Sequence, residues 1–382
     1  MKVTVAFFSN YLTHHQLPFC FEMQSRIGGD FAFVATEEIE QERISLGYED
    51  MNHKYSFVVN AHDSDSMKSE ALRLARECDV VIFGSAPEFY LQERMKLNKL
   101  TFRYCERPLK KGRHRIFNPR VLNTMLHMHT AYSLKKLYLL CASAYTYGDC
   151  ALVGGYPGKA FKWGYFPQNE VHGDIDNLIS NKAPASILWA GRLIELKHPD
   201  LAIEVAKRLK SNGIEFELNI LGNGILKEKL EKEIYDSGLG DCVHILGAVP
   251  SNMVRDYMNK SEIFLFTSDR NEGWGAVLNE AMNSACAVVA NKSIGSVPFL
   301  IKDKENGLLY EDGNADSLVQ KVNYCLAHRE ECHRLGRMAY QSIDGLWNAK
   351  VATERFLALS GALLAGKKVS FDQGPCSKAT LL

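Results

Sequence analysis

The sequence predicts an α/β fold of two domains, each built on a parallel sheet with helices on its faces. Short apolar runs alternate with helical patterns along most of the chain, and this alternation is typical of parallel sheets. The length of 382 residues exceeds what one hydrophobic core usually supports. We therefore expect two domains of ordinary size.

The composition is that of a globular protein without a global charge. Hydrophobic residues make up 46% and charged residues 24%, and the 45 basic and 45 acidic residues balance, so no general attraction to nucleic acid is expected. The apolar runs are too short for a signal peptide or a membrane span, which predicts a cytoplasmic protein. The 10 cysteines form no Cys-x-x-Cys pair, so we expect reduced thiols and no structural zinc.

The first half of the chain begins with a buried strand and a polar loop. The apolar run Val3 to Ser9 predicts the strand, and residues 10–18 follow it directly. Loops at the carboxyl ends of parallel strands face the ligand crevice, so His14 and His15 are candidates for substrate contact; the alternative is that both are solvated loop residues. Further strands are predicted at Phe31 to Thr36, Tyr55 to Asn60, Asp79 to Ser85, Leu100 to Cys105 and Leu137 to Cys141.

Asp63-Ser64-Asp65 follows a predicted strand. An Asp-x-Asp in such a place can hold a divalent metal against a nucleotide diphosphate. A helical run, Ser66 to Arg76, follows at once, and Asp and Ser are the residues that cap helix N-termini. We therefore favour capping over metal binding.

The stretch from Arg103 to Lys136 is strongly basic. With apolar residues interleaved, it could lie against anionic lipid headgroups or a lipid-linked phosphate, particularly from Arg107 to Arg115; the alternative is a solvated basic helix and loop. The only acid in the stretch is Glu106. Its basic residues are Arg103, Arg107, Lys110, Lys111, Arg113, Arg115, Arg120, Lys135 and Lys136.

An interdomain linker is predicted at about Phe166 to Pro184, and the second domain opens after it. Its first strand leads into a loop that carries Arg192 and Lys197, and Pro199 then starts an amphipathic helix. Two cations on the ligand edge of a sheet suit a diphosphate. The strands of this domain are predicted at Ser186 to Ala190, Phe216 to Gly222, Val243 to Val249, Ile263 to Thr267, Cys286 to Asn291 and Gly307 to Glu311.

The stretch from Asn271 to Met282 reads as a loop and a helix between two of these strands. Gly273 and Gly275 allow a ligand to approach the backbone, and the helix that they open would point free N–H groups at an anion. Glu272 lies before that helix and Glu280 about two turns into it. Two acids around an anion site suit a nucleotide sugar, whereas a solvated helix with a glycine entry loop is the alternative.

Motifs along the predicted second domain resemble the C-terminal half of the retaining glycosyltransferases called family 4, or group 1. The resemblance covers about residues 183–326 and implies the GT-B fold, two Rossmann-like domains with parallel sheets facing across a cleft. Its motifs are Gly191-Arg192, Lys197, Pro199, Gly222-x-Gly224, Gly247, Glu272-Gly273-Trp274-Gly275, Glu280-Ala281-Met282, Gly295 and Asn306-Gly307-Leu308.

The resemblance implies roles for single residues. Arg192 and Lys197 would bind the donor diphosphate and stabilise the leaving nucleotide, and with Glu272, which would contact the donor sugar, they are the expected catalytic residues. Glu280 would bind the ribose. Other donor contacts are expected from Gly273, Trp274, Gly275, Ala276 and Val277, mainly through backbone amides, and from the thin loops at Gly222, Gly247 and Val249.

The N-terminal half departs from the family pattern. The glycine pair common after the first strand is replaced by Asn10 to Gln16, and the usual histidine after a middle strand is replaced by Glu106-Arg107. His14, His15, Glu106 and Arg107 are therefore candidates for acceptor or sugar contact. The family's Pro-Glu near the donor loop reads Pro298-Phe299, so one donor contact is expected to differ.

The domains expected are an acceptor-binding domain at 1–170, a nucleotide-sugar domain at 183–345, a helix at 346–366 crossing back to the first domain, and a tail at 367–382. The predicted function is retaining, metal-independent transfer of a sugar from a UDP- or GDP-linked donor to a glycan or polyprenyl-diphosphate-linked acceptor, in cell-surface polysaccharide synthesis. No cofactor is expected, and the protein would be cytoplasmic or peripheral on the inner face of the membrane. The alternatives are a catalytically silent sugar-nucleotide binding module and a GT-B epimerase.

Overall fold

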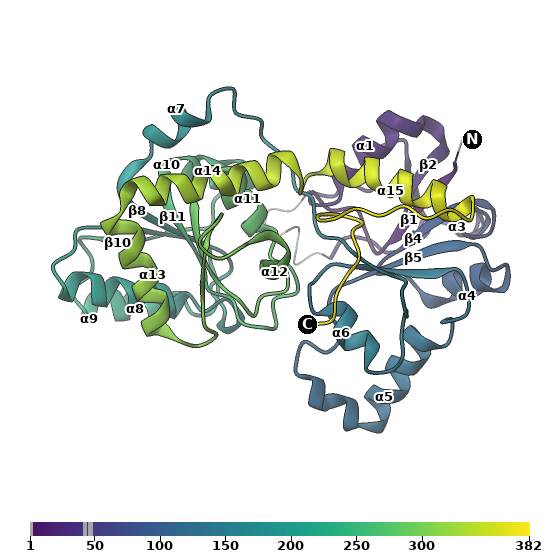
Figure 1. Cartoon of the computed structure of the whole chain (residues 1–382), viewed down its shortest axis with the longest axis horizontal. Helices are drawn as coiled ribbons and strands as arrows, with labels where there is room; N and C mark the ends of the chain where they lie inside the picture. The colour runs from purple at the N-terminus through teal and green to yellow at the C-terminus, as the bar shows by residue number, and fades with distance from the viewer. Residues whose placement is uncertain (1–2, 41–43, 45–48) are drawn as a thin grey trace. The chain divides into compact units, whose positions relative to one another are not determined.

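The computed structural model describes residues 3–40, 44 and 49–382 and divides into two compact units (Figure 1). The first unit comprises Met1–Gln168 and Asn348–Leu382, and the second comprises Asn169–Trp347. Each unit has its own parallel sheet. The chain therefore leaves the first unit once and returns to it for its last helix and tail.

The sheet of the first unit has the order β3-β2-β1-β4-β5-β6-β7 among the described residues. All of its neighbouring strands pair in parallel, with Val5 aligned to Phe31 on one side and to Val80 on the other. The strands are β1 Val5–Ser9, β2 Phe31–Ala35, β3 Val58–Asn60, β4 Val80–Phe83, β5 Leu100–Cys105, β6 Leu137–Cys141 and β7 Ala160–Lys162. The first six were predicted, whereas the three-residue β7 was too short to leave a pattern.

Helices cover this sheet, and the last of them comes from the end of the chain. Phe356 of α15 packs within 6.1 Å of the Phe19 ring on α1 and 5.1 Å from the Phe102 ring of β5, measured between ring centroids. An apolar face on α15 thus completes the first core. The helices of this unit are α1 Leu17–Ile27, α3 Asp65–Glu77, α4 Glu88–Lys96, α5 Pro119–Met125, α6 Thr146–Ala151 and α15 Ala349–Leu364, with a π-helix at Leu126–Thr130.

The C-terminal tail, whose packing the sequence did not predict, runs beside β7. The Cys376 N–H donates to the Lys162 carbonyl at 2.8 Å, and Lys378 forms an antiparallel bridge with Phe161. The thiol of Cys376 is fully buried, which raises its pKa far above the usual range. The tail is therefore an integral part of the first unit.

The second sheet repeats the same order, β10-β9-β8-β11-β12-β13, again with parallel pairing throughout its described strands. Buried residues of the sheet, such as Ile187 and Leu218, pack with residues of the covering helices, such as Val205 of α8, to form a hydrophobic core. Its strands are β8 Ala183–Ala190, β9 Glu217–Leu221, β10 Val243–Gly247, β11 Ser261–Phe266, β12 Ala287–Asn291 and β13 Leu308–Tyr310. Its helices are α7 Ile175–Ser180, α8 Pro199–Ser211, α9 Lys227–Asp236, α10 Ser251–Lys260, α11 Val277–Asn283, α12 Val297–Leu300, α13 Ala315–Ala327 and α14 Arg329–Gly345.

The prediction of a linker from 166 to 184 is wrong for most of that stretch. Residues from Asn169 onward belong to the second unit, and Ile179 of α7 packs on Ala285 and Tyr340. The polar composition misled the prediction because α7 is short and buries little of its surface. No helix among the described residues is long and apolar enough to cross a membrane.

Candidate active site

Both sheets reverse their strand order beside their first strand. The order changes between β1 and β4 in the first unit and between β8 and β11 in the second. In open parallel sheets, ligands bind outside the carboxyl ends of the strands at such a point, because the connecting helices diverge to opposite faces there. The loops after these four strands are therefore the places to examine.

In the second unit, an ion pair joins the loops that follow β8 and β11. The Lys197 ammonium contacts the Glu272 carboxylate, and the Ser268 hydroxyl donates to the same carboxylate oxygen at 3.2 Å. The lysine and glutamate side chains are 17% and 14% exposed, so the pair is half-buried and still reachable from solvent. The structure thus brings together two residues that are 75 positions apart in the chain.

The backbone of Lys197 is fixed by a chain of hydrogen bonds from the sheet. The Trp189 indole N–H donates to the Thr267 hydroxyl at 2.8 Å, and that hydroxyl donates to the Lys197 carbonyl at 2.7 Å. Asp269 donates its N–H to the Leu196 carbonyl at 3.0 Å. The lysine loop is therefore held to the end of β11 rather than free in solvent. Arg192 lies in the same loop, with an exposed side chain.

Gly222 and Gly224 support this loop. Their φ angles are 142° and 158°, and a Cβ on them would lie 1.8 Å from the Gly191 carbonyl oxygen and 2.4 Å from that of Leu193. Only glycine allows such close packing of two backbones. These glycines pack closely against the protein's own backbone, and a donor contact at Gly222 stays a prediction.

The neighbouring loop follows β10. The Gly222 N–H donates to the Gly247 carbonyl at 2.8 Å, and Gly247 has a φ of 75°, which favours glycine. Val249 is half-buried in the same loop. These residues therefore lie along the same edge of the sheet as the lysine loop.

Trp274, predicted as a donor contact, is a core residue. Its side chain is fully buried, its ring lies 6.4 Å from Phe299 and 6.2 Å from Trp347, and its indole N–H donates to Asn279 at 2.8 Å. Only its backbone is available to a ligand. Phe299, which replaces the family's glutamate, also belongs to this cluster, so that change serves packing.

Helix α11 begins later than predicted. Gly275 has a φ of 76°, and a Cβ there would lie 2.4 Å from the Phe266 ring, so residue 275 cannot be helical and the helix starts at Val277. Glu280 consequently lies in the first turn and not about two turns in. The segment Gly273 to Val277 forms a loop, with Ala276 and Val277 half-buried at its end.

Glu280 is half-buried, and its environment changes its acidity. Burial raises the pKa of its carboxyl above the usual 4.5, although the positive charge of Arg255 opposes this. Arg255 is itself buried and donates to the Glu280 carbonyl oxygen and to Asn283, each at 3.1 Å. The carboxyl is thus held at the start of α11 by a firmly anchored helix.

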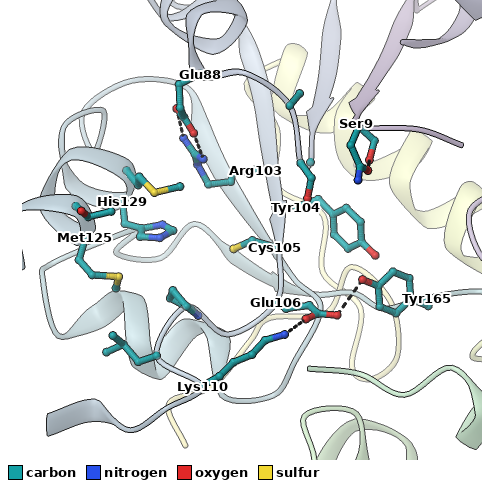
Figure 2. A pocket seen from close by; sticks show the side chains of 18 of the residues that line it. Ser9, Glu88, Arg103, Tyr104, Cys105, Glu106, Lys110, Met125, His129 and Tyr165 are labelled. Carbon is teal, nitrogen blue, oxygen red and sulfur yellow. Dashed lines mark hydrogen bonds and ion pairs between the residues drawn. The ribbon is translucent and has the colours of Figure 1, made fainter. Parts of the chain in front are cut away.

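In the first unit, a cavity of about 810 Å³ lies beyond the ends of β1, β4 and β5 (Figure 2). Ser9, Gly84 and Cys105, which stand at those ends, all line it. The cavity therefore occupies the point where the strand order reverses, as the topology predicts.

The four predicted acceptor contacts differ in position. His15 and Glu106 line the cavity. His14 lies against His15, with ring centroids 3.7 Å apart, but does not line it. Arg107 does not line it either: its guanidinium is buried, 3.2 Å from Asp149 and 4.8 Å from the Tyr145 ring centroid. Arg107 is therefore used inside the fold.

Further residues of the cavity were missed by sequence reasoning. Arg103 forms a two-point ion pair with Glu88, at 2.7 and 3.0 Å, and His129 and Met125 lie nearby (Figure 2). The sequence carried one signal, because Arg103 stands inside an otherwise apolar strand. We counted it with the basic segment, whereas its charge is buried and paired.

Three cations of the basic segment from Arg107 to Arg115 have internal acidic partners. Asp149 is completely buried and binds both Arg107 and Arg113, the latter at 2.8 Å, while Lys110 pairs with Glu106. Within the described part of the chain, ion pairs are absent at Lys111, Arg115, Arg120, Lys135 and Lys136. The unpaired charge therefore lies at Lys111 and Arg115, inside the predicted segment, and at Arg120, Lys135 and Lys136, in the rest of the predicted basic stretch.

Asp63 and Asp65 flank a helix cap. The Ser64 hydroxyl accepts from the Met67 N–H at 3.2 Å and is the N-cap of α3, as the capping interpretation predicted. Across the residues that the structure describes, no group of three or more His, Cys, Asp or Glu side chains has the arrangement of a metal site.

Residues 174–342 match the family model described as "Glycosyl transferases group 1". This part of the chain is similar to the glycosyl transferase group 1 family. It contains both cationic residues of the lysine loop and both acids, Glu272 and Glu280. The resemblance seen in the motifs is therefore confirmed for this half.

Two curated relatives match part of the chain. The amylovoran biosynthesis glycosyltransferase AmsK of Erwinia amylovora is 36% identical over 141 residues, which are 36% of this chain and 34% of that protein. The N-acetylgalactosamine-N,N'-diacetylbacillosaminyl-diphospho-undecaprenol 4-alpha-N-acetylgalactosaminyltransferase of Campylobacter jejuni is 38% identical over 140 residues, 37% of each chain. The chain thus spans about a third of the length of these relatives.

The whole fold is similar to solved structures. HepE of Anabaena, in complex with UDP, matches with a TM-score of 0.68 and 14% identity over 94% of this chain and 100% of that chain. At this identity the likeness shows the fold alone. This likeness confirms the GT-B fold class that the sequence predicts.

Proposed function

We propose that the chain is a glycosyltransferase that moves a sugar from a nucleoside diphosphate donor to a glycan or lipid-linked acceptor in cell-surface polysaccharide synthesis. The observation that carries the proposal is the Lys197–Glu272 pair at the reversal point of the sheet in the part of the chain that is similar to group 1. AmsK, named for amylovoran biosynthesis, and the UDP complex of HepE support the pathway and the donor class. UDP is accordingly the donor nucleotide to test first, and GDP the second.

The proposed chemistry follows from the charges at this edge. Lys197 and Arg192 would neutralise the diphosphate that develops negative charge as it leaves, and their loop is fixed in advance by Thr267. Charge stabilisation of this kind is strongest when the donors do not have to reorganise. Glu272 keeps Lys197 in place and stands next to Gly273, where the sugar would lie. Retention of configuration, by substitution on the face from which the nucleotide leaves, is part of the proposal.

A catalytically silent sugar-nucleotide binding module would use the same site. The two functions differ only in turnover, because both require donor binding. Release of the nucleoside diphosphate in the presence of acceptor separates them, and its absence with every acceptor tested would favour the silent module. An epimerase would need an additional base to activate water or to start an elimination. The proposed site does not include such a base.

Donor binding is expected to depend on Glu280 and on pH. Glu280→Gln should weaken UDP binding at least fivefold at pH 8, because a carboxylate accepts two ribose hydroxyls better than an amide does. Since burial raises the pKa of Glu280 above 4.5, the wild type should lose affinity as the pH falls towards that raised value, whereas the variant should not. Calorimetric titration with UDP at several pH values measures both. An unchanged dissociation constant in the variant would refute the ribose assignment.

Transfer is expected to proceed without a metal ion. The proposed leaving-group stabilisation comes from Arg192 and Lys197, which perform the part that a divalent ion has in other transferases. Activity should stay within twofold of its starting value in excess EDTA. Loss of activity that manganese or magnesium restores would contradict this assignment.

We propose peripheral membrane binding for the part of the predicted basic stretch that begins at Arg115. Phe117 and Leu134 are 87% and 97% exposed, and Leu122 and Leu126 are exposed between them. Exposed apolar side chains among unpaired cations suit an anionic bilayer, to which each cation contributes roughly 1 kcal/mol near the surface. The cations of this surface are Arg115, Arg120, Lys135 and Lys136.

Two variants test this surface. Phe117→Ser with Leu134→Ser, and separately the four cations replaced by Gln, should each reduce sedimentation with vesicles containing phosphatidylglycerol. Replacing four lysines of the second unit, Lys207, Lys229, Lys232 and Lys302, by Gln is the matched control for lost charge. Sedimentation equal to the wild type in both test variants at low salt would exclude the surface, since salt screens exposed charges within about 8 Å.

A further inference from the structure

The cavity of the first unit contains a buried guanidinium with an unused donor. Both terminal nitrogens of Arg103 bind Glu88, so its Nε–H is left over, and that nitrogen is buried without a hydrogen-bond partner. Arg103 is 3% exposed and lines the cavity. A buried donor without a partner is costly to the folded state, so a ligand oxygen that accepts from it would remove this cost.

His129 stands at the same end of the cavity and adds a second donor. It is 3% exposed, and its Nδ1 lies 3.3 Å from the Tyr156 hydroxyl. Burial, together with the charge of Arg103, lowers the pKa of His129 to about 3, so the ring is neutral at physiological pH. Burial keeps the Tyr156 hydroxyl protonated by raising its pKa, so it can donate to Nδ1. The Nε2 then carries the proton of the neutral ring.

The wall beside these donors is apolar. Met125 and Met128 come from the end of α5 and the π-helix after it, and both line the cavity. Figure 2 shows the Met125 thioether next to the His129 ring, with the Arg103–Glu88 pair beyond it. Thioethers are flexible and pack well against small apolar groups such as a methyl.

The net charge at the Arg103–His129 end of the cavity disfavours a carboxylate at that position. Glu88 compensates Arg103, and His129 is neutral, so two donors are present without a net positive charge. A carboxylate placed against Arg103 and His129 would lose its hydration without meeting an unpaired cation at that end, because the unpaired Arg115 and Arg120 line the cavity elsewhere along the chain. A neutral carbonyl attached to a methyl group fits both the donors and the thioether wall.

We propose that this cavity binds an acetamido sugar of the acceptor, with the acetamido carbonyl accepting from Arg103 Nε and His129 Nε2 and the methyl group against Met125 and Met128. As an acceptor site it rests on the proposed transferase function. As a binding site it is independent of the second unit, because every residue that it uses belongs to the first. Uncharged sugars without an acetyl group and uronic acids are the ligands that it would discriminate against.

The test measures ligand binding to the full chain by saturation-transfer NMR, with three methyl glycosides: those of N-acetylglucosamine, glucose and glucuronic acid. The acetamido methyl protons should receive the strongest saturation, and the affinity for the acetamido sugar should exceed that for the other two at least tenfold. Equal affinities for all three glycosides would overturn the proposal. Tighter binding of the glucuronide would instead assign the site to a carboxylate and also overturn it.

Two variants locate the ligand. His129→Phe removes the donor and keeps a ring of similar size, and Met128→Trp fills the cavity from a half-buried position. Each should reduce acetamido-sugar affinity at least tenfold. Leu126→Ala, on the same π-helix but exposed and outside the cavity lining, is the matched control and should bind as the wild type does. Unchanged affinity in both variants would exclude the cavity.

UDP binding is measured on the same samples, and it separates this inference from the proposed function. Retained UDP binding in a variant that has lost the acetamido sugar shows a folded protein and supports the cavity. If the wild type binds the acetamido sugar but neither UDP nor GDP, the transferase proposal fails while the sugar site stands. If the wild type binds UDP but shows no preference for the acetamido sugar, the sugar site fails while the transferase proposal stands.

Discussion

Replacing Lys197 with alanine is expected to lower the rate of sugar transfer about 30- to 1,000-fold, equivalent to roughly 2–4 kcal/mol of transition-state stabilisation. The ammonium is held at the reversal point of the second sheet by Glu272 and by the fixed loop behind it. A leaving diphosphate gains most from a charge that is already in place. Arg192→Ala should have an effect in the same range, because its side chain starts in the same loop.

Steady-state kinetics with a UDP-sugar donor measures the effect, and Lys207→Ala is the matched control. Lys207 lies on α8, directly after the lysine loop, and pairs with Glu233 away from the edge of the sheet. Glu272→Ala should slow transfer more than it weakens UDP binding, since it faces the sugar side. Activity of Lys197→Ala within threefold of the wild type would remove Lys197 from the proposed mechanism.

Replacing Asp149 with alanine is expected to destabilise the first unit by about 3–5 kcal/mol, the scale measured when one partner of a buried ion pair is removed. The Asp149 carboxylate is completely buried and accepts from Arg107, Arg113 and the Leu109 N–H, at 3.2, 2.8 and 3.1 Å. Without it, the buried Arg107 would be left charged and without its carboxylate. The loop that forms one wall of the cavity would lose its anchor.

Hydrogen exchange of the full chain measures this loss, because it reports each unit separately. Protection of the β5 and β6 amides should fall by about two orders of magnitude or more, while that of β8 and β11 should not change. Glu70→Ala is the control for the same unit, since Glu70 forms an exposed pair with Arg73 that is worth about 1 kcal/mol at most. Equal protection in Asp149→Ala and Glu70→Ala would show that the aspartate is not an anchor.

The sequence by itself determined the class of fold and the edge of the sheet that carries the chemistry. Parallel strands are buried on both faces, so they appear as apolar runs, and a loop after such a run must lie at the carboxyl edge. This reasoning places Arg192, Lys197 and Glu272 correctly without any knowledge of their contacts. It also recognised the Ser64 cap, because capping is a local interaction.

Tertiary structure decided what depends on contacts between distant residues. Charges in the sequence carry no sign of their partners, so Arg103 and Arg107 looked like part of a basic surface, whereas they are buried and paired with Glu88 and Asp149. The Trp274 side chain packs with Trp347 and Phe299 in the core, so only its backbone can make the donor contact that the sequence predicts. The cavity with Arg103, His129 and Met125 is assembled from β5, the π-helix and α5, segments that adjoin it only after the sheet forms, so no local pattern could predict it.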